Sequence, residues 1–146
     1  MAAETTLLPA GLRLDLTEAP PAELRAALLE GILAFHDRTV PLDRRRFALR
    51  VEDAAGVLVA GLAATLSWQW MFVEAVWVAE DRRGQGLGRV MLARAEAEAR
   101  ARGCHSAWLD TFQARAFYLA QGYEEFGALT DYPPGQVRSF LRKRLA

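Results

Sequence analysis

The sequence predicts an α/β (α+β) fold, in which helices flank a mixed central sheet of six to seven strands. The chain has 146 residues, the length of one ordinary domain, and 52% of them are apolar, which is enough to bury a core. Runs with the two-residue period of strands alternate with runs of helical period along the chain. We find no repeat, linker or low-complexity segment, so we expect a single domain over residues 1–146.

The N-terminal part should form a strand and then a helix. In residues 12–17, leucines alternate with Arg13 and Asp15, as in a half-buried strand. Pro20 and Pro21 are suited to the first turn of a helix, and apolar residues keep one of its faces hydrophobic until about Arg38.

Three more strands are predicted in the first 80 residues, over residues 47–52, 57–67 and 71–79. Residues 53–56 read as the turn between the first two. The run over 71–79 is the richest in β-branched and aromatic residues, so we expect it inside the sheet.

The remaining elements follow the pattern helix, strand, helix, strand, strand. A helix should run from about Leu87 to Arg102, with Gly103 as its C-cap. Its charged residues, including Glu96 and Glu98, read as a solvated face with i,i+4 partners at Arg100 and Arg102. A strand over 107–111, a helix over 113–121 and strands over 123–129 and 137–145 complete the fold.

Composition excludes several classes of protein. Eighteen basic and eighteen acidic residues cancel, which argues against a general nucleic-acid or membrane-surface binder. The single cysteine, Cys104, allows no internal disulfide, and no Cys/His cluster suggests a metal. Residues 1–11 lack the pattern of a signal peptide, and no apolar run is long enough to span a membrane. We therefore expect a cytoplasmic protein.

Three glycines, Gly84, Gly86 and Gly88, stand at alternate positions between a predicted strand and a predicted helix. Glycine allows left-handed backbone and close approach of a ligand, and the first N–H groups of the helix have no partner within it. Such a turn binds phosphate through its amides and the helix dipole, although a plain tight turn is the alternative. The glycine spacing does not fit a dinucleotide-binding fingerprint, and the chain has no lysine before Lys143 to make a nucleoside-triphosphate loop.

The segment closely resembles the acyl-coenzyme A loop of the GNAT superfamily of N-acetyltransferases, through Arg83, Gly86 and Gly88. A second segment, residues 116–123 (AFYLAQGY), resembles the C-terminal motif of the same family. The resemblance extends from about Leu12 to Leu145 and is residue-specific near 73–92 and 110–126. The chain departs from the family pattern at one point, because Gln113 stands nearest to where many members carry an asparagine that contacts the pantetheine arm.

The resemblance implies direct attack of a primary amine on acetyl-coenzyme A, with no metal. Tyr118 is expected to donate a proton to the departing thiolate, since a phenol is protonated at neutral pH. Glu74 is the expected base, because its apolar neighbours should desolvate it and raise its pKa. Asp110 is the reserve base. The alternatives are purely structural roles: Glu74 could face solvent, Asp110 could cap the next helix, and Tyr118 could only fill the core.

The cofactor and acceptor sites are assigned residue by residue. Cofactor contacts are expected from the strand, the loop and the second motif: Val76, Trp77, Val78, Arg83, Gly84, Gln85, Gly86, Leu87, Gly88, Arg89, Gln113 and Tyr118. Trp77 and Val78 should pair with the pantetheine arm through their backbone. Amine contacts are expected from Trp68, Trp70, Phe72, Asp110 and Tyr132, although the aromatic residues would also suit a core or a dimer surface.

Two other classes of function stay open at this point. Some domains of this kind bind acyl-coenzyme A as sensors or scaffolds without turnover, and a nucleotide-binding module would prefer NAD or ATP. The acceptor is expected to be a small molecule or a peptide, and such domains often pair as homodimers.

Overall fold

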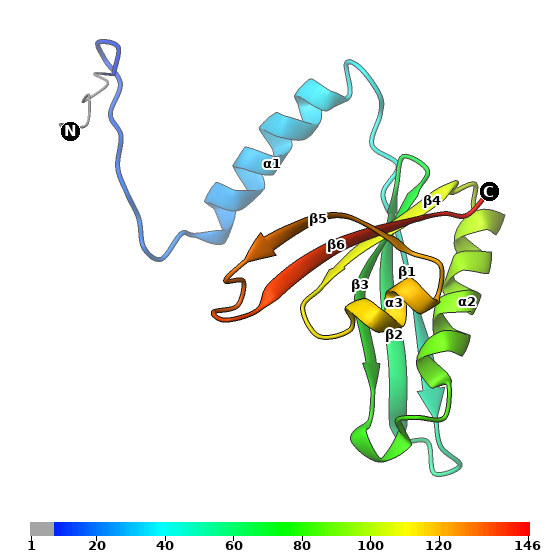
Figure 1. The fold of residues 1–146 in the computed structure, drawn as a ribbon. Helices are drawn as coiled ribbons and strands as arrows, with labels where there is room; N and C mark the ends of the chain where they lie inside the picture. The colour runs from blue at the N-terminus through cyan, green and yellow to red at the C-terminus, as the bar shows by residue number, and fades with distance from the viewer. Residues whose placement is uncertain (1–7) are drawn as a thin grey trace. The chain divides into compact units, whose positions relative to one another are not determined.

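Six strands form one sheet in the order β1-β2-β3-β4-β6-β5 in the computed structural model, which describes residues 8–146 (Figure 1). The strands are β1 (Arg45–Glu52), β2 (Leu58–Ser67), β3 (Trp70–Val78), β4 (Ser106–Thr111), β5 (Glu124–Thr130) and β6 (Val137–Arg144). Every neighbouring pair is antiparallel except β3 and β4. That parallel pair needs a crossover, which η1 (Glu80–Arg82) and α2 (Leu87–Ala101) supply. The mixed sheet with flanking helices confirms the predicted fold class.

The chain divides into two units, residues 1–41 and 42–146. In the first unit, α1 (Ala22–His36) begins directly after Pro21, as expected. The predicted strand over residues 12–17 is wrong, because these residues pair with no strand in the described chain. Leu14 and Leu16 are 80% and 87% exposed, so their alternation with polar residues buries nothing. Most of the segment that lacks a signal-peptide pattern lies outside the described residues.

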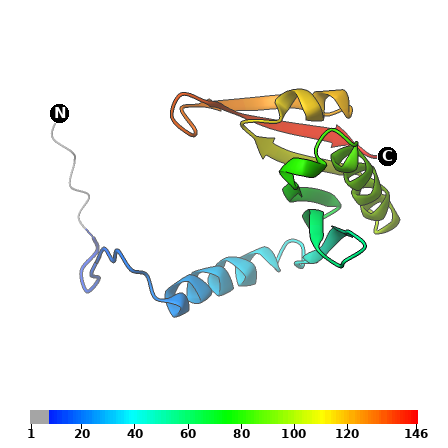
Figure 2. The ribbon, with the colours of Figure 1, turned by 90° about the horizontal axis from the view of Figure 1, so that it is seen from below.

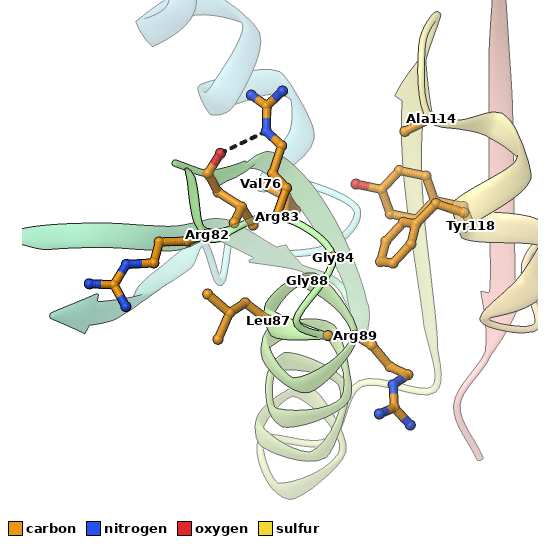
Figure 3. A pocket seen from close by; sticks show the side chains of 12 residues that line it. Val76, Arg82, Arg83, Gly84, Leu87, Gly88, Arg89, Ala114 and Tyr118 are labelled. Atoms are coloured by element: carbon orange, nitrogen blue, oxygen red, sulfur yellow. Dashed lines mark hydrogen bonds between the residues drawn. The ribbon is translucent and has the colours of Figure 1, made fainter. Parts of the chain in front are cut away.

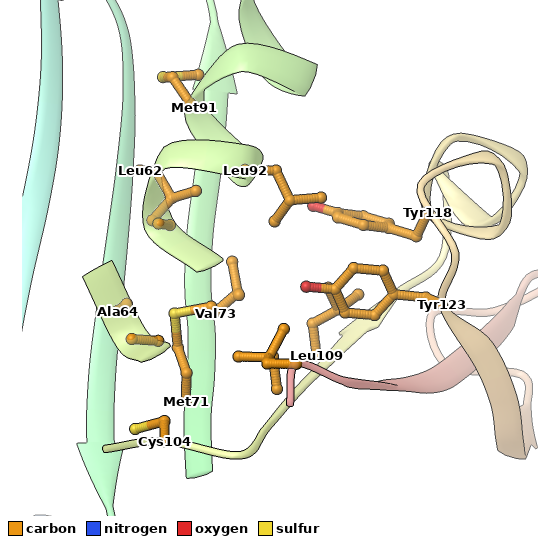
Figure 4. Packing of buried hydrophobic residues seen from close by; sticks show 14 of the residues in the cluster. Leu62, Ala64, Met71, Val73, Met91, Leu92, Cys104, Leu109, Tyr118 and Tyr123 are labelled. Atoms are coloured by element: carbon orange, nitrogen blue, oxygen red, sulfur yellow. The ribbon is translucent and has the colours of Figure 1, made fainter. Parts of the chain in front are cut away.

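In the second unit, α2 and α3 (Arg115–Ala120) pack on the same face of the sheet, seen from two directions in Figures 1 and 2. Their apolar side chains join those of the strands in one cluster (Figure 4). The cluster includes Leu62 from β2, Val73 from β3, Leu92 from α2, Leu109 from β4 and Tyr118 from α3. No helix of the described chain combines the length and apolarity that crossing a membrane requires.

The polar face of α2 differs from the prediction. Glu98 does pair with Arg102, at 2.8 Å, as the i,i+4 spacing indicates. Glu96 instead is only 5% exposed and forms an ion pair of 2.8 Å with Lys143 of β6. The solvated-face interpretation is therefore wrong for Glu96, since the periodicity of one helix does not reveal a cation on a distant strand.

Strand β3 carries a β-bulge and soon leaves β4. Val73 pairs with Ala64 and Ala75 with Ala63, so Glu74 is the extra residue. The bulge changes which side chains face α2, from Met71 and Val73 before it to Val76 and Val78 after it. Strands β3 and β4 pair only from Trp70 to Phe72. Beyond Phe72, the edge of β3 that faces β4 has no partner strand in the described chain.

Candidate active site

The turn between η1 and α2 presents a row of free backbone donors. Gly84 and Gly86 have φ angles of +77° and +81°, in the left-handed region that favours glycine. In residues 8–146, no protein acceptor takes the N–H groups of residues 84–89. These groups surround the N-terminus of α2, where the helix dipole also favours an anion. The turn therefore has the geometry and the charge of a phosphate-binding loop.

Arginine side chains add positive charge to this loop. Arg83 folds back so that its Nε donates to the backbone oxygen of Val78 at 3.1 Å, which ties the loop to the end of β3 (Figure 3). Arg82 and Arg89 line the same cleft. None of the three makes an ion pair with a described carboxylate. Their charge is available to an anionic ligand.

A cleft of about 500 Å³ joins the two sequence motifs. Its walls come from the end of β3, the glycine turn and α3 (Figure 3). The lining residues are Val76, Val78, Arg82, Arg83, Gly84, Gly86, Leu87, Gly88, Arg89, Ala114, Phe117 and Tyr118. A Cβ atom on Gly88 would lie 3.3 Å from Cζ of Phe117, so the glycine also permits the close approach of α2 and α3.

Tyr118 is the polar group that the wall of α3 presents to the cleft. Its side chain is 7% exposed, and its ring packs edge-on against Phe117 and Tyr123 at 5.0 and 5.8 Å between centroids. Its hydroxyl points toward the loop and β3 (Figure 3). Burial raises the pKa of Tyr118. The phenol therefore keeps its proton at neutral pH and is available as a donor.

Glu74 does not have the environment that the sequence predicted. Its side chain is exposed, because it follows the inward-facing Val73 and so lies with Phe72 on the sheet face away from α2. The expected desolvation by apolar neighbours is wrong, since Val73 and Val76 point to the other face and Ala75 and Trp77 are themselves exposed. Its Oε1 accepts a hydrogen bond from the Thr65 hydroxyl. It also lines a second pocket on that face, with Trp70 and Phe72.

Asp110 is held by an ion pair rather than free. Its Oδ1 accepts a bond of 2.7 Å from Arg138, whose guanidinium also lies 4.1 Å from the ring centroid of Tyr132. Asp110 does not cap α3, because the Thr111 hydroxyl accepts the N–H of Ala114 instead. Its carboxylate is thus less available for proton transfer than that of Glu74.

The structure places the other predicted residues in different surroundings. Gln85, Gln113 and Trp77 are exposed and do not line the cleft. Trp68 lies in the β2–β3 turn, outside both pockets. The sequence interpretation missed Arg82, Ala114 and Phe117 as lining residues. Phe117 stands within the second motif and Arg82 directly before the glycine loop, so the sequence holds a signal for both, whereas Ala114 lies outside both motifs. Across residues 8–146, no group of three His, Cys, Asp or Glu side chains is placed to hold a metal ion.

Comparison with known proteins decides the family. The model of the acetyltransferase (GNAT) family matches residues 12–123. The chain belongs to this family. A relative, the blasticidin-S acetyltransferase of Streptomyces morookaense, is 43% identical over 93 residues, which cover 62% of this chain and 68% of that protein. An acetyltransferase of Agrobacterium fabrum is 31% identical over 132 residues, or 88% of this chain and 96% of the relative.

A solved structure agrees with the GNAT fold over most of the chain. The crystal structure of an acetyltransferase from Bacillus cereus superposes with a TM-score of 0.82 at 25% identity, covering 89% of this chain and 97% of the other. The glycine turn, the cleft and Tyr118 therefore stand in a GNAT acetyltransferase.

Proposed function

We propose that this protein transfers an acetyl group from acetyl-coenzyme A to a primary amine of a small molecule. One observation carries the proposal: the free amides of residues 84–89 and the Tyr118 hydroxyl open into a single cleft. An anion-binding turn fits a pyrophosphate, and a neutral phenol fits a leaving thiolate. Both features are what acyl transfer from a phosphorylated carrier requires.

The residues present fit the carrier along its length. The amides of residues 84–89, with Arg82 and Arg89, would hold the pyrophosphate. The unpaired edge of β3 beyond Phe72 offers backbone groups to an extended pantetheine arm, in the manner of an added strand. Val76, Leu87 and Phe117 provide apolar walls between these two regions.

When bound, acetyl-coenzyme A supplies a thioester whose carbonyl carbon the amine attacks directly, so that a C–N bond forms and the C–S bond breaks. Glu74 takes a proton from the ammonium group of the acceptor, directly or through a water molecule, and so leaves the neutral amine that attacks. The Tyr118 O–H donates a hydrogen bond, and then its proton, to the departing sulfur. Much of the rate acceleration would come from holding the acetyl donor and the amine side by side.

A relative supports a small-molecule acceptor in preference to a peptide. The Streptomyces morookaense protein is named for blasticidin S, and it is 43% identical to this chain over the matched segment. The sequence identity over that segment is well above the level at which two proteins share the fold alone.

The test is a thiol-release assay with acetyl-coenzyme A and a panel of small amines, polyamines, aminoglycosides, amino acids and lysine peptides. We expect release that depends on a small-molecule amine. Calorimetry with acetyl-coenzyme A, NAD and ATP accompanies it. Tight acetyl-coenzyme A binding without release for any amine would favour a sensor or scaffold, and tighter binding of NAD or ATP would exclude the acyl-carrier site.

Two expectations from the sequence, a homodimer and a cytoplasmic location, stay predictions. Sedimentation equilibrium of the purified chain would test the first.

A further inference from the structure

A second pocket, of about 320 Å³, lies on the sheet face that carries Glu74. Strand pairing explains how it is assembled. Arg46 of β1 pairs with Thr65 of β2, Thr65 with Phe72 of β3, and Phe72 with Trp108 of β4. These side chains form one row across four strands, and all of them line the pocket. No carrier contact assigned above uses this face.

The floor of the pocket is aromatic. The rings of Phe72 and Trp108 are stacked, with centroids 4.3 Å apart and planes inclined by 24°. Trp70, one row further along β3, lines the pocket as well. A flat, unsaturated body of a ligand would find extended ring surface here.

The two sides of the pocket carry opposite charges. Glu74 provides a carboxylate on β3, held by the Thr65 hydroxyl. Arg44 and Arg46 provide two guanidinium groups at the β1 side. Neither arginine makes an ion pair with a carboxylate of the described chain.

The neighbouring arginines Arg50 and Arg45 are each held by a group of the described chain. Arg50, on the same strand, pairs with Glu52 at 2.8 Å. Arg45 donates to the backbone oxygen of Arg102 at 3.2 Å. Thus Arg50 is neutralised by a carboxylate and Arg45 is tied to a backbone oxygen, whereas Arg44 and Arg46 line the pocket without an ion pair to a carboxylate of the described chain.

We propose that this pocket receives the acceptor, and that the acceptor is an amine with a flat body and a carboxylate at its far end. The ammonium group would lie at Glu74 and the carboxylate at Arg44 and Arg46. Backbones two strands apart in a sheet are about 10 Å apart, so several bonds must separate the two groups of the ligand. The assignment of Glu74 as the base rests on the proposed function, whereas the charge preference of the pocket is measurable without turnover.

The probe is 4-(aminomethyl)benzoate, compared with its neutral isostere 4-(aminomethyl)benzamide. Both are titrated against tryptophan fluorescence, since Trp70 and Trp108 line the pocket. We expect the acid to bind about tenfold more tightly, the size of effect that charge-assisted bonds to arginine give. Arg46→Gln and Arg44→Gln should each remove most of that preference. Arg50→Gln, the same change on the same strand outside the pocket, should keep it.

Equal affinity of the acid and the amide for the wild-type chain would overturn the inference, as would an equal effect of Arg46→Gln and Arg50→Gln. Circular dichroism melting curves of the three variants establish that each is folded. Thiol release separates this inference from the proposed function. Preference for the acid without release in the presence of acetyl-coenzyme A supports the pocket and contradicts the enzyme. Release with neutral amines that Arg46→Gln leaves unchanged contradicts the pocket and supports the enzyme.

Discussion

Tyr118 and Tyr123 are chemically identical and nearly equally buried, yet their hydroxyl groups have different surroundings. The Tyr118 hydroxyl points into the cleft, whereas that of Tyr123 lies in the core with no hydrogen-bond partner among the described residues (Figures 3 and 4). Burial raises the pKa of both. The first hydroxyl is available to a ligand in the cleft, and the second has a cost in stability.

Replacing Tyr118 by Phe should lower kcat by about a hundredfold, the lower end of the range for a general acid. The KM for acetyl-coenzyme A should change little, because the hydroxyl acts on the leaving sulfur and the ring that fills the wall is kept. Steady-state kinetics of the two enzymes measure both constants. An equal loss in kcat and in affinity for acetyl-coenzyme A would reject the role as acid.

Replacing Tyr123 by Phe should raise the free energy of unfolding by about 1 kcal/mol, because an unpartnered buried hydroxyl is removed. Urea denaturation at pH 7 measures it. Because the pKa of Tyr123 is raised in the folded chain, the folded state keeps a proton that the unfolded state loses above about pH 10. The free energy of unfolding of the wild type should therefore fall as the pH rises beyond 10, and that of Tyr123→Phe should fall less steeply. If Tyr123→Phe were less stable than the wild type both at pH 7 and above pH 10, the hydroxyl of Tyr123 would not be an unpartnered buried group.

At the level of elements, the turn before α2 combines left-handed glycines with free amides. Gly86→Val should reduce acetyl-coenzyme A affinity by more than about a hundredfold, since a β-branched residue is strained at a φ of +81° and would displace several amides. The fold should persist because the turn is outside the core. Calorimetry measures the affinity.

Gly56 offers a matched control for that substitution. It has a φ of +79° in the turn before β2, and a Cβ atom at this position would meet no other atom within 4 Å. Gly56→Val should bring comparable backbone strain and leave the affinity unchanged. Equal losses in the two variants would show that strain, rather than the phosphate loop, explains the result.

The Glu96–Lys143 pair joins α2 to β6 in a largely buried position. Lys143→Met should lower the free energy of unfolding toward the lower end of about 3–5 kcal/mol, because Glu96 is left without its cation. Arg94→Met removes half of an exposed pair with Glu98 and should lower the free energy of unfolding far less. Urea denaturation of both variants gives the comparison. Similar losses would mean that the buried pair contributes no more than the exposed one.

The elements themselves could be predicted closely from periodicity, caps and turn residues. Three details could not. The leucines of residues 12–17 have a strand period, but a strand also needs a partner. Glu74 stands in a run that is apolar on both faces, and the bulge beside it interrupts the alternation that would show which face is buried. Glu96 looked solvated because its partner lies on a strand far along the sequence.

For the whole molecule, binding to the folded chain should raise its thermal stability. Acetyl-coenzyme A at a hundredfold excess over its Kd should add about 2.7 kcal/mol and raise Tm by roughly 5–10 °C. NAD and ATP at the same concentration should give much smaller shifts, because the glycine spacing fits neither. Differential scanning calorimetry measures the three ligands side by side. A larger shift with NAD or ATP would contradict the assignment of the cleft.

The proposed carrier cleft could be predicted from the sequence better than the second pocket. The reason is that residues of the cleft lie in two short segments, whereas those of the pocket are far apart along the chain. The glycine turn and Tyr118 belong to segments with their own recognisable motifs. Arg46, Thr65, Phe72 and Trp108 belong to four strands and meet only through the pairing of the sheet. None of them has a local signature, so only the register brings them together.

The short pairing of β3 and β4 has a kinetic consequence. Since those strands separate after Phe72, the proposed carrier cleft and the Glu74 pocket lie on opposite faces around the same opening. The acetyl donor and the amine acceptor would then bind from opposite faces of the sheet, and neither would block the binding of the other. We expect a ternary complex in which both are present before any bond changes, so double-reciprocal plots at several fixed donor concentrations should intersect rather than run parallel.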